Sequence, residues 1–360
     1  MSRSSLVLLL SAVALVSACG GRPAESPAPQ AAQPAPAPPG PRIYVSDDTG
    51  GRVVVVDPAA GTVVSTLAVG KRPRGLHVLN DGQRLLVALS GSPIAGPGVD
   101  ESKLPPADRK ADGIGVVDVK ALQVPRVLRS GQDPESFALS LDEKTAYVSN
   151  EDAAEMSVVD VESGEIRGRV PVGEEPEGVR MRPDGKVVYV TCEGDNSVVA
   201  VDTTSLKEIA RIKTGARPRD IAFTRDGALA FVTAENSGEI TVFDVKTHKV
   251  TATIPLPRPA GAPVPPRPMG AVLSPDGQTV YISNGRAKSI SVIDVATLKV
   301  TRTIDDVGAR PWGIGISPDG MMLYTANGSS GDVSVVDAAT GQVVRRIATG
   351  GSPWGISVPR

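Results

Sequence analysis

Short apolar runs alternate with turn residues along most of this chain. Between residues 313 and 355 four such runs occur, with the sequences GIGIS, MMLYTAN, VSVVD and VVRRIAT. They are separated by Pro318-Asp319-Gly320, Asn327-Gly328 and Thr340-Gly341, residues that favour tight turns. Apolar runs of this length, bounded by turn signals, predict four antiparallel strands.

The same four-run unit repeats from residue 43 to the end of the sequence. The aspartate that ends each third run marks the repeat, at Asp57, Asp118, Asp160, Asp202, Asp244, Asp294 and Asp337. Successive aspartates are 61, 42, 42, 42, 50 and 43 residues apart. A period of about 42 residues with four strands per unit is typical of a β-propeller. The sequence therefore predicts an all-β fold, a seven-bladed β-propeller with four-stranded antiparallel blades.

The first unit lacks its first run, which appears at the other end of the chain. Residues 43–46 match the second run of the later units, whereas residues 355–358 match the missing first run. We expect this C-terminal strand to pair into the first blade and close the ring, because closure removes the exposed edges of an open array. Two units are longer than the rest, through insertions at residues 90–112 and 257–267. Both fall in connections that leave the same face of a propeller.

The N-terminal segment resembles a bacterial lipoprotein signal. An apolar stretch at residues 6–16 leads into Val16-Ser17-Ala18-Cys19, followed by Gly20. This pattern predicts a signal peptide at residues 1–18, a lipidated Cys19 with a disordered Pro/Ala-rich tether at residues 19–41, and the propeller at residues 42–360. The protein would then lie in the cell envelope, periplasmic or associated with the outer membrane, touching the membrane through its lipid alone. An ordinary secretory signal with a chance cysteine is the alternative.

Composition narrows the partners of the protein. With 38 Lys and Arg against 40 Asp and Glu, the formal net charge is -2, which gives no support to nucleic-acid binding. Only two cysteines are present, and Cys19 is assigned to lipid, so no intramolecular disulfide is expected and Cys192 is predicted to be a structural thiol. We expect a monomer.

Several phrases carry a family resemblance. Residues 146–150 (AYVSN), 188–191 (VYVT), 291–294 (SVID) and 334–337 (SVVD) resemble the YVTN-type β-propeller repeat. The junctions between units, such as Arg72-Pro73-Arg74-Gly75 and Pro353-Trp354-Gly355, are similar to those of periplasmic PQQ-dependent catabolism-associated β-propeller proteins. The resemblance implies a noncatalytic accessory or binding role beside a periplasmic oxidation system.

The residue after each junction proline is the candidate site. Innermost strands line the axis of a propeller, so these side chains should surround the channel mouth. They are Arg74, Glu135, Glu177, Arg219, Met269, Trp312 and Trp354. Two readings remain open: the charges pair and the indoles fill gaps between blades, or the ring binds an anionic or aromatic small molecule or a loop of a partner protein.

Catalytic and metal chemistry have little support in the sequence. His77 and His248 belong to different units, His77 being expected to pack in a strand and His248 to be solvated. No metal-binding motif, nucleophile elbow or phosphate loop is present, so no cofactor, PQQ included, is predicted. The seven repeated aspartates are interpreted as turn residues rather than metal ligands. The leading hypothesis is a noncatalytic binding or scaffolding propeller; the alternative is a lyase or hydrolase with Glu135 or Glu177 as acid or base.

Overall fold

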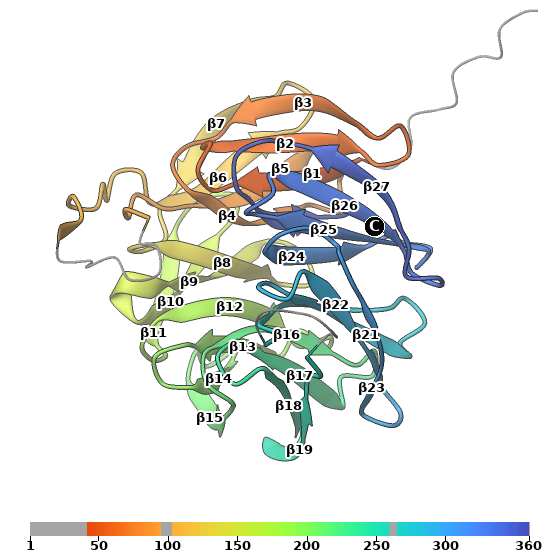
Figure 1. The fold of residues 1–360 in the computed structure, drawn as a ribbon. Coiled ribbons are helices and arrows are strands. Elements are labelled where there is room, and N and C mark those ends of the chain that lie inside the picture. The colour runs from red at the N-terminus through yellow and green to blue at the C-terminus, as the bar shows by residue number, and fades with distance from the viewer. Residues whose placement is uncertain (1–41, 95–102, 259–264, 360) are drawn as a thin grey trace, which may run out of the picture. The chain divides into compact units, whose positions relative to one another are not determined.

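The computed structural model describes residues 42–94, 103–258 and 265–359, and these form 28 strands in seven four-stranded antiparallel sheets (Figure 1). The predicted seven-bladed propeller is therefore confirmed. Within each blade consecutive strands pair side by side, except that β28 joins β1. The predicted segments for the signal peptide and tether, residues 1–41, lie outside the described residues and stay predictions. No helix among the described residues is long and apolar enough to cross a membrane.

The strands of the first four blades, from inside to outside, are as follows. They are β28 (Pro353–Ser357), β1 (Ile43–Asp47), β2 (Arg52–Asp57), β3 (Thr62–Ala68); β4 (Pro73–Val78), β5 (Arg84–Leu89), β6 (Gly113–Asp118), β7 (Gln123–Leu128); β8 (Pro134–Leu139), β9 (Thr145–Asn150), β10 (Glu155–Asp160), β11 (Ile166–Pro171); and β12 (Pro176–Met181), β13 (Val187–Cys192), β14 (Ser197–Asp202), β15 (Glu208–Lys213).

The other three blades follow the same order. They are β16 (Pro218–Phe223), β17 (Leu229–Ala234), β18 (Glu239–Asp244), β19 (Lys249–Pro255); β20 (Pro268–Leu273), β21 (Thr279–Asn284), β22 (Ser289–Asp294), β23 (Lys299–Ile304); and β24 (Pro311–Ile316), β25 (Met322–Asn327), β26 (Asp332–Asp337), β27 (Val343–Ala348). The short 3₁₀ helix η2 (Glu151–Ala153) follows β9.

Apolar side chains fill the spaces between neighbouring blades. One cluster joins Leu86 and Ile114 of one blade to Val148 and Val159 of the next, all fully buried. Both faces of the second and third strands are thus covered, which explains the continuous Val-rich runs there. The fourth strands lie at the rim, and in β15 five of the six residues are not buried, as expected for an edge protected by charge.

The repeated aspartates close turns at the end of every third strand. Each accepts a hydrogen bond from the backbone N–H three residues later, as when Asp244 Oδ1 accepts from Thr247 N at 2.7 Å. The interpretation as turn residues is confirmed.

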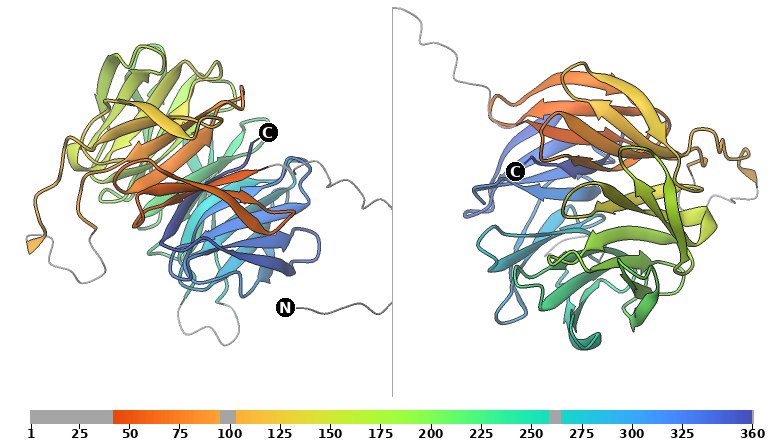
Figure 2. Two further views of the ribbon diagram at one scale, coloured as in Figure 1. Left: turned by 90° about the horizontal axis from the view of Figure 1, so that it is seen from above. Right: turned by 180° about the vertical axis from the view of Figure 1, so that it is seen from behind.

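Closure of the ring occurs as predicted. Strand β28 pairs antiparallel with β1, with Tyr44 opposite Ser357 and Val45 opposite Ile356. The first insertion begins directly after β5 and the second joins β19 to β20, so both leave the strands at the end where the inner strands begin. In the view from above, the described part of the first insertion projects beyond the strands (Figure 2, left).

A β-bulge near the start of each inner strand sets the position of the residue after the junction proline. Pro73 lies opposite Leu89 and Leu76 opposite Val87, so residues 74 and 75 share a single partner, and the other six inner strands repeat this shift. The second residue of several of these bulges must be glycine, because adjacent blades approach closely there. A Cβ on Gly178 would lie 2.2 Å from the carbonyl oxygen of Arg219.

Hydroxyl groups of the second strands join the bulges of adjacent blades. Ser149 Oγ accepts from the Ser136 backbone N–H at 3.1 Å and donates to the Glu177 carbonyl of the next blade at 2.6 Å. Equivalent bonds to the next blade come from Ser46, Thr191, Thr233 and Ser283. The hydroxyl residue at the third position of the YVTN-like phrase, Ser149 in Tyr147-Val148-Ser149-Asn150, therefore bonds to the backbone of the residue after the next junction proline.

Candidate functional site

The seven residues that follow the junction prolines surround the axis, and we call them the mouth ring. Outside the ring lies a funnel of about 450 Å³, and inside it lies a channel cavity of about 140 Å³. Arg219, Trp312 and Trp354 line both spaces, so they form the floor of the funnel and the roof of the cavity. The first insertion supplies part of the funnel wall through Ser92, Pro93, Leu104 and Arg109 among others. Six of the seven ring residues line one or both of these spaces, whereas the fully buried Glu135 lines neither.

The apolar part of the mouth ring is built around the two indoles. Trp312 and Trp354 stack with centroids 6.1 Å apart and planes 25° apart, and both stay partly exposed. Gly328 leaves room for this pair, because a Cβ there would lie 2.8 Å from the Trp312 ring. Met269 is 4% exposed and contributes mainly to packing.

The charged part of the mouth ring contains both expected pairs. Arg74 pairs with Glu135, and Arg219 Nη2 lies 3.6 Å from Glu177 Oε1. Each arginine has a further partner that sequence reasoning missed. Arg74 Nε lies 3.2 Å from Asp48 Oδ1, and Arg219 Nη1 pairs with Glu193.

The missed partners belong to a second ring, formed by the residue that directly follows each second strand. Its members are Asp48, Ser90, Glu151, Glu193, Glu235, Gly285 and Gly328. Four of them are acidic, and this signal was present in the sequence because each directly follows a second apolar run. The two glycines stand beside Met269 and Trp312, so the apolar arc continues through both rings.

A third ring precedes the junction prolines. It comprises Arg72, Asp133, Glu175, Arg217, Arg267, Arg310 and Ser352. Five of these residues have positive φ, namely 40° at Arg72, 55° at Asp133, 49° at Glu175, 60° at Arg217 and 58° at Arg310. Side chains other than glycine rarely adopt this left-handed backbone, and a following proline restricts them further. Such strain is often concentrated at functional sites.

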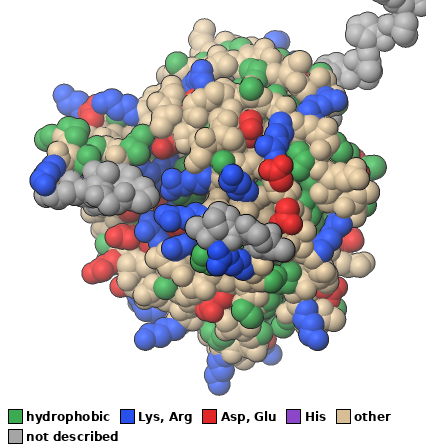
Figure 3. Space-filling model, viewed as in Figure 1, with side chains coloured by type: hydrophobic (Ala, Val, Ile, Leu, Met, Phe, Trp, Pro, Cys, Tyr) green, Lys and Arg blue, Asp and Glu red, His purple; other side chains and the backbone are tan. Residues whose placement is uncertain are grey.

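Six arginines line the funnel, and Lys and Arg side chains form a patch at the middle of this face (Figure 3). Arg310 lies with its guanidinium 4.4 Å from the centre of the Trp312 ring and is exposed. It has no carboxylate within ion-pair distance among the residues that the structure describes, whereas Arg217 Nε lies 2.7 Å from Glu193. Partial desolvation of the Arg310 guanidinium lowers its pKa; Glu235 opposes this shift, whereas Arg219, Arg286 and Arg217 lower the pKa further. Positive charge is therefore incompletely balanced here.

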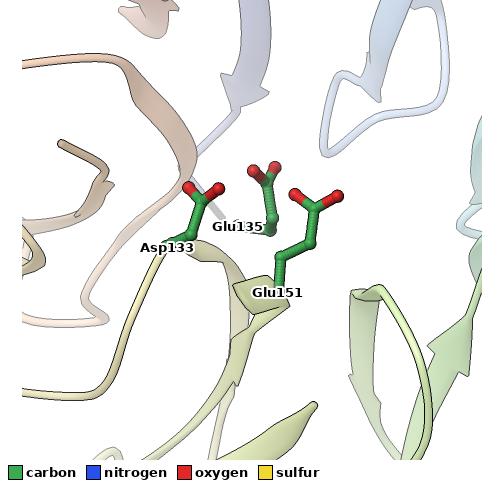
Figure 4. Close-up of side chains that lie close together, drawn as sticks. All are labelled: Asp133, Glu135 and Glu151. Atoms are coloured by element: carbon green, nitrogen blue, oxygen red, sulfur yellow. The ribbon is translucent and has the colours of Figure 1, made fainter. Parts of the chain in front are cut away.

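Three carboxylates gather in the blade of β8 and β9. Asp133, Glu135 and Glu151 each have a carboxylate oxygen within 4.8 Å of the other two, and the three groups lie side by side (Figure 4). Burial is the main cause that raises the pKa of all three carboxyls, to about 7 for Glu151. The sequence nominated only Glu135, because nothing in its pattern showed that Glu151 would fold back beside it.

The two histidines and the described cysteine lie away from this cluster. His77 lies on β4, half exposed, 3.7 Å from Glu143. His248, expected to be solvated, is instead partly buried with Nε2 3.0 Å from the Tyr189 hydroxyl, because its turn folds against the neighbouring blade. Cys192 is a buried free thiol, and burial raises its pKa to about 12, as a structural role requires.

Solved structures share the fold at low sequence identity. Hydrazine synthase from Kuenenia stuttgartiensis is 20% identical, with a TM-score of 0.66, over 79% of this chain and 89% of that one. A Bacteroides uniformis protein, provisionally named a 6-phosphogluconolactonase, is 17% identical with a TM-score of 0.68, over 88% and 98%. A protein of unknown function from Desulfotomaculum acetoxidans is 14% identical with a TM-score of 0.71, over 89% and 99%. These likenesses concern the fold alone.

Sequence comparison gives a family rather than an activity. Among curated proteins, none matches this chain significantly. The narrower resemblance to PQQ-associated propellers is not addressed by these comparisons and stays a resemblance. The model of the YNCE-like β-propeller family, however, matches residues 100–358, which cover most of the blades. With its YVTN-like repeats and its closed ring, this chain belongs to the YNCE-like β-propeller family.

Proposed function

We propose that this protein is a noncatalytic binding propeller of the cell envelope, which takes an anionic ligand with a planar apolar part into the funnel. One observation carries the proposal: Arg310 is exposed, stacked on Trp312, and lacks a carboxylate partner among the described residues. A guanidinium in this state is ready to pair with a carboxylate or phosphate of a ligand.

The tryptophan pair supplies the complementary apolar surface. Trp312 and Trp354 are partly exposed at the floor of the funnel, and aromatic anchors beside arginine are typical of binding surfaces. The funnel volume of about 450 Å³ suits a small molecule or the tip of a protein loop. Strained backbone at Arg310 and Arg217 also favours a functional role for this rim.

The lyase or hydrolase alternative has weaker support. It assigned acid or base chemistry to Glu135 or Glu177, but Glu135 pairs with Arg74 and Glu177 lies 3.6 Å from Arg219. Carboxylates held by guanidinium groups are suited to positioning those arginines. Turnover of a lactone or ester that is abolished by Glu177→Gln would favour the enzyme over the binding protein.

Intrinsic fluorescence tests the binding site directly, because both tryptophans of the chain lie in the mouth ring. Benzoate, benzyl alcohol and acetate separate the contributions of charge and ring. We expect benzoate to shift the emission and raise the melting temperature, benzyl alcohol and acetate to bind more weakly, and Arg310→Gln to lose the benzoate response. Arg225→Gln, an exposed arginine on the turn between β16 and β17 at the other end of the blade, is the matched control. Equal responses of Arg310→Gln and wild type would refute the site.

The envelope location depends on Cys19 and has its own test. Cells expressing the full chain are grown with labelled palmitate and fractionated. We expect label on the wild-type protein and none on Cys19→Ala, because the lipid would be attached at that residue. An unlabelled wild-type protein would refute the anchor without affecting the funnel.

A further inference from the structure

The carboxylate cluster lies apart from the arginines that carry the proposed anion site. Asp133 comes from the ring before the prolines, Glu135 from the mouth ring and Glu151 from the ring after the second strands, all within one blade. Figure 4 shows the three carboxylates side by side, on side chains from the segment before β8, from β8 and from η2. Asp133 and Glu151 also line the funnel, so the cluster is open to solution on one side.

Positive charge around the cluster is insufficient. Arg72 lies 3.8 Å from Asp133 and 4.0 Å from Glu135, but it also lies 3.5 Å from Asp48. Arg74 is likewise shared between Glu135 and Asp48. Two arginines therefore serve four carboxylates, Asp48 and the cluster, which leaves a deficit of two positive charges. Glu151 has no Lys or Arg within ion-pair distance in the part of the chain that is described.

One oxygen of the cluster is both buried and unsatisfied. Glu135 is 0% exposed; its Oε2 accepts from Arg74, but its Oε1 accepts no hydrogen bond from any described residue. A buried carboxylate oxygen without a donor is costly, and native structures rarely keep one unless a ligand or water satisfies it. Arg72 Nη2 lies 4.0 Å from this same Oε1, too far for a hydrogen bond. The unmet hydrogen bond is independent of the number of acids, and it favours a ligand bound beside Oε1.

From these contacts we infer that Asp133, Glu135 and Glu151 bind a divalent cation in the wall of the funnel. The ligand set contains only carboxylate oxygens, which hard cations such as Ca²⁺ and Mg²⁺ prefer. Ca²⁺ suits the cluster better, because it tolerates irregular coordination, whereas Mg²⁺ requires a nearly ideal octahedron. Water from the funnel would complete the coordination, and the charge of the cation would match the deficit of two. The inference does not depend on the proposed anion site.

Terbium luminescence tests the inference, because Tb³⁺ replaces Ca²⁺ at oxygen sites and emits when a nearby indole is excited. Trp354 lines the same funnel as Asp133 and Glu151, and the mouth ring holds both tryptophans of the chain. We expect sensitised emission from the full-length protein, displaced by Ca²⁺ and less readily by Mg²⁺. Glu151→Gln should weaken Tb³⁺ binding by at least about tenfold, since it removes one of three ligands.

Controls separate metal binding from folding and from the anion site. Glu151 is only partly buried, so its variant should fold, and Glu162→Gln, an exposed carboxyl in the same blade, should bind Tb³⁺ as wild type does. Ca²⁺ should raise the melting temperature of wild type and of Arg310→Gln, but not that of Glu151→Gln. Absence of both sensitised emission and a Ca²⁺ shift would overturn the inference, as would unchanged Tb³⁺ binding by both Glu151→Gln and Asp133→Asn.

Discussion

Removal of one hydroxyl, in Ser149→Ala, tests how adjacent blades hold the mouth ring. Ser149 is fully buried, and its Oγ bonds to the Ser136 backbone N–H and to the Glu177 carbonyl of the next blade. Alanine would leave both backbone groups without this partner. At about 1–3 kcal/mol for each of the two unsatisfied buried groups, we expect the free energy of unfolding to fall by roughly 2–6 kcal/mol.

The blade of β4–β7 offers the matched variant that should gain stability. Ala88 occupies the position equivalent to Ser149 and is also fully buried, so this blade lacks the hydroxyl. We expect Ala88→Ser to raise the free energy of unfolding by about 1 kcal/mol, by donating to the Glu135 carbonyl. Urea unfolding, followed by tryptophan emission, measures both variants. A loss below about 0.5 kcal/mol in Ser149→Ala, a value typical of a neutral surface change, would refute the reasoning.

Three further predictions concern packing, closure and pH. Gly178→Ala should lower the melting temperature markedly, since its Cβ would lie 2.2 Å from the Arg219 carbonyl oxygen, and an unchanged melt would contradict the close approach of the blades. Deletion of residues 355–360 removes most of the strand that pairs with β1, so calorimetry should show a sharply lower melting temperature; wild-type melting would contradict a stabilising closure. The pKa of Glu151, raised to about 7 in the fold, means that the folded state binds a proton more tightly than the unfolded chain does. Without added metal, the free energy of unfolding should therefore decrease as pH rises from about 4.5 through 7, by at most roughly 3 kcal/mol, and Glu151→Gln should flatten this profile.

Local patterns explain why the fold was predictable from sequence. Turn residues such as Pro318-Asp319-Gly320 and the aspartates that end each third strand form hydrogen bonds within a few residues, so they can be interpreted without the tertiary structure. The missing first run likewise required β28 to close the ring. Mouth-ring residues could be placed by topology alone, because one position per blade must surround the axis.

The partners of those residues could not be placed in the same way. Arg74 pairs with Asp48 as well as with Glu135, and this choice depends on the bulge after Pro73 and on the distance between blades. The approach of Glu151 to Asp133 depends on η2, whose three residues carry no repeat signal. Arg310 has a positive φ of 58° and stacks on Trp312, and a sequence pattern discloses neither feature.

The contact between Arg74 and Trp354 crosses the closure of the ring. The guanidinium lies 5.2 Å from the indole centre, although the two residues are separated by almost the whole length of the propeller in sequence. Contacts of this separation form late in folding, so the funnel should be among the last features to assemble. A ligand that contacts both Arg74 and Trp354 would hold the ring closed. At a ligand concentration one hundred times its dissociation constant, it would raise the free energy of opening by about 2.7 kcal/mol. A bound ligand would then lengthen the time that the ring stays closed without changing its shape. Slower hydrogen exchange of the β28 amides would measure this effect.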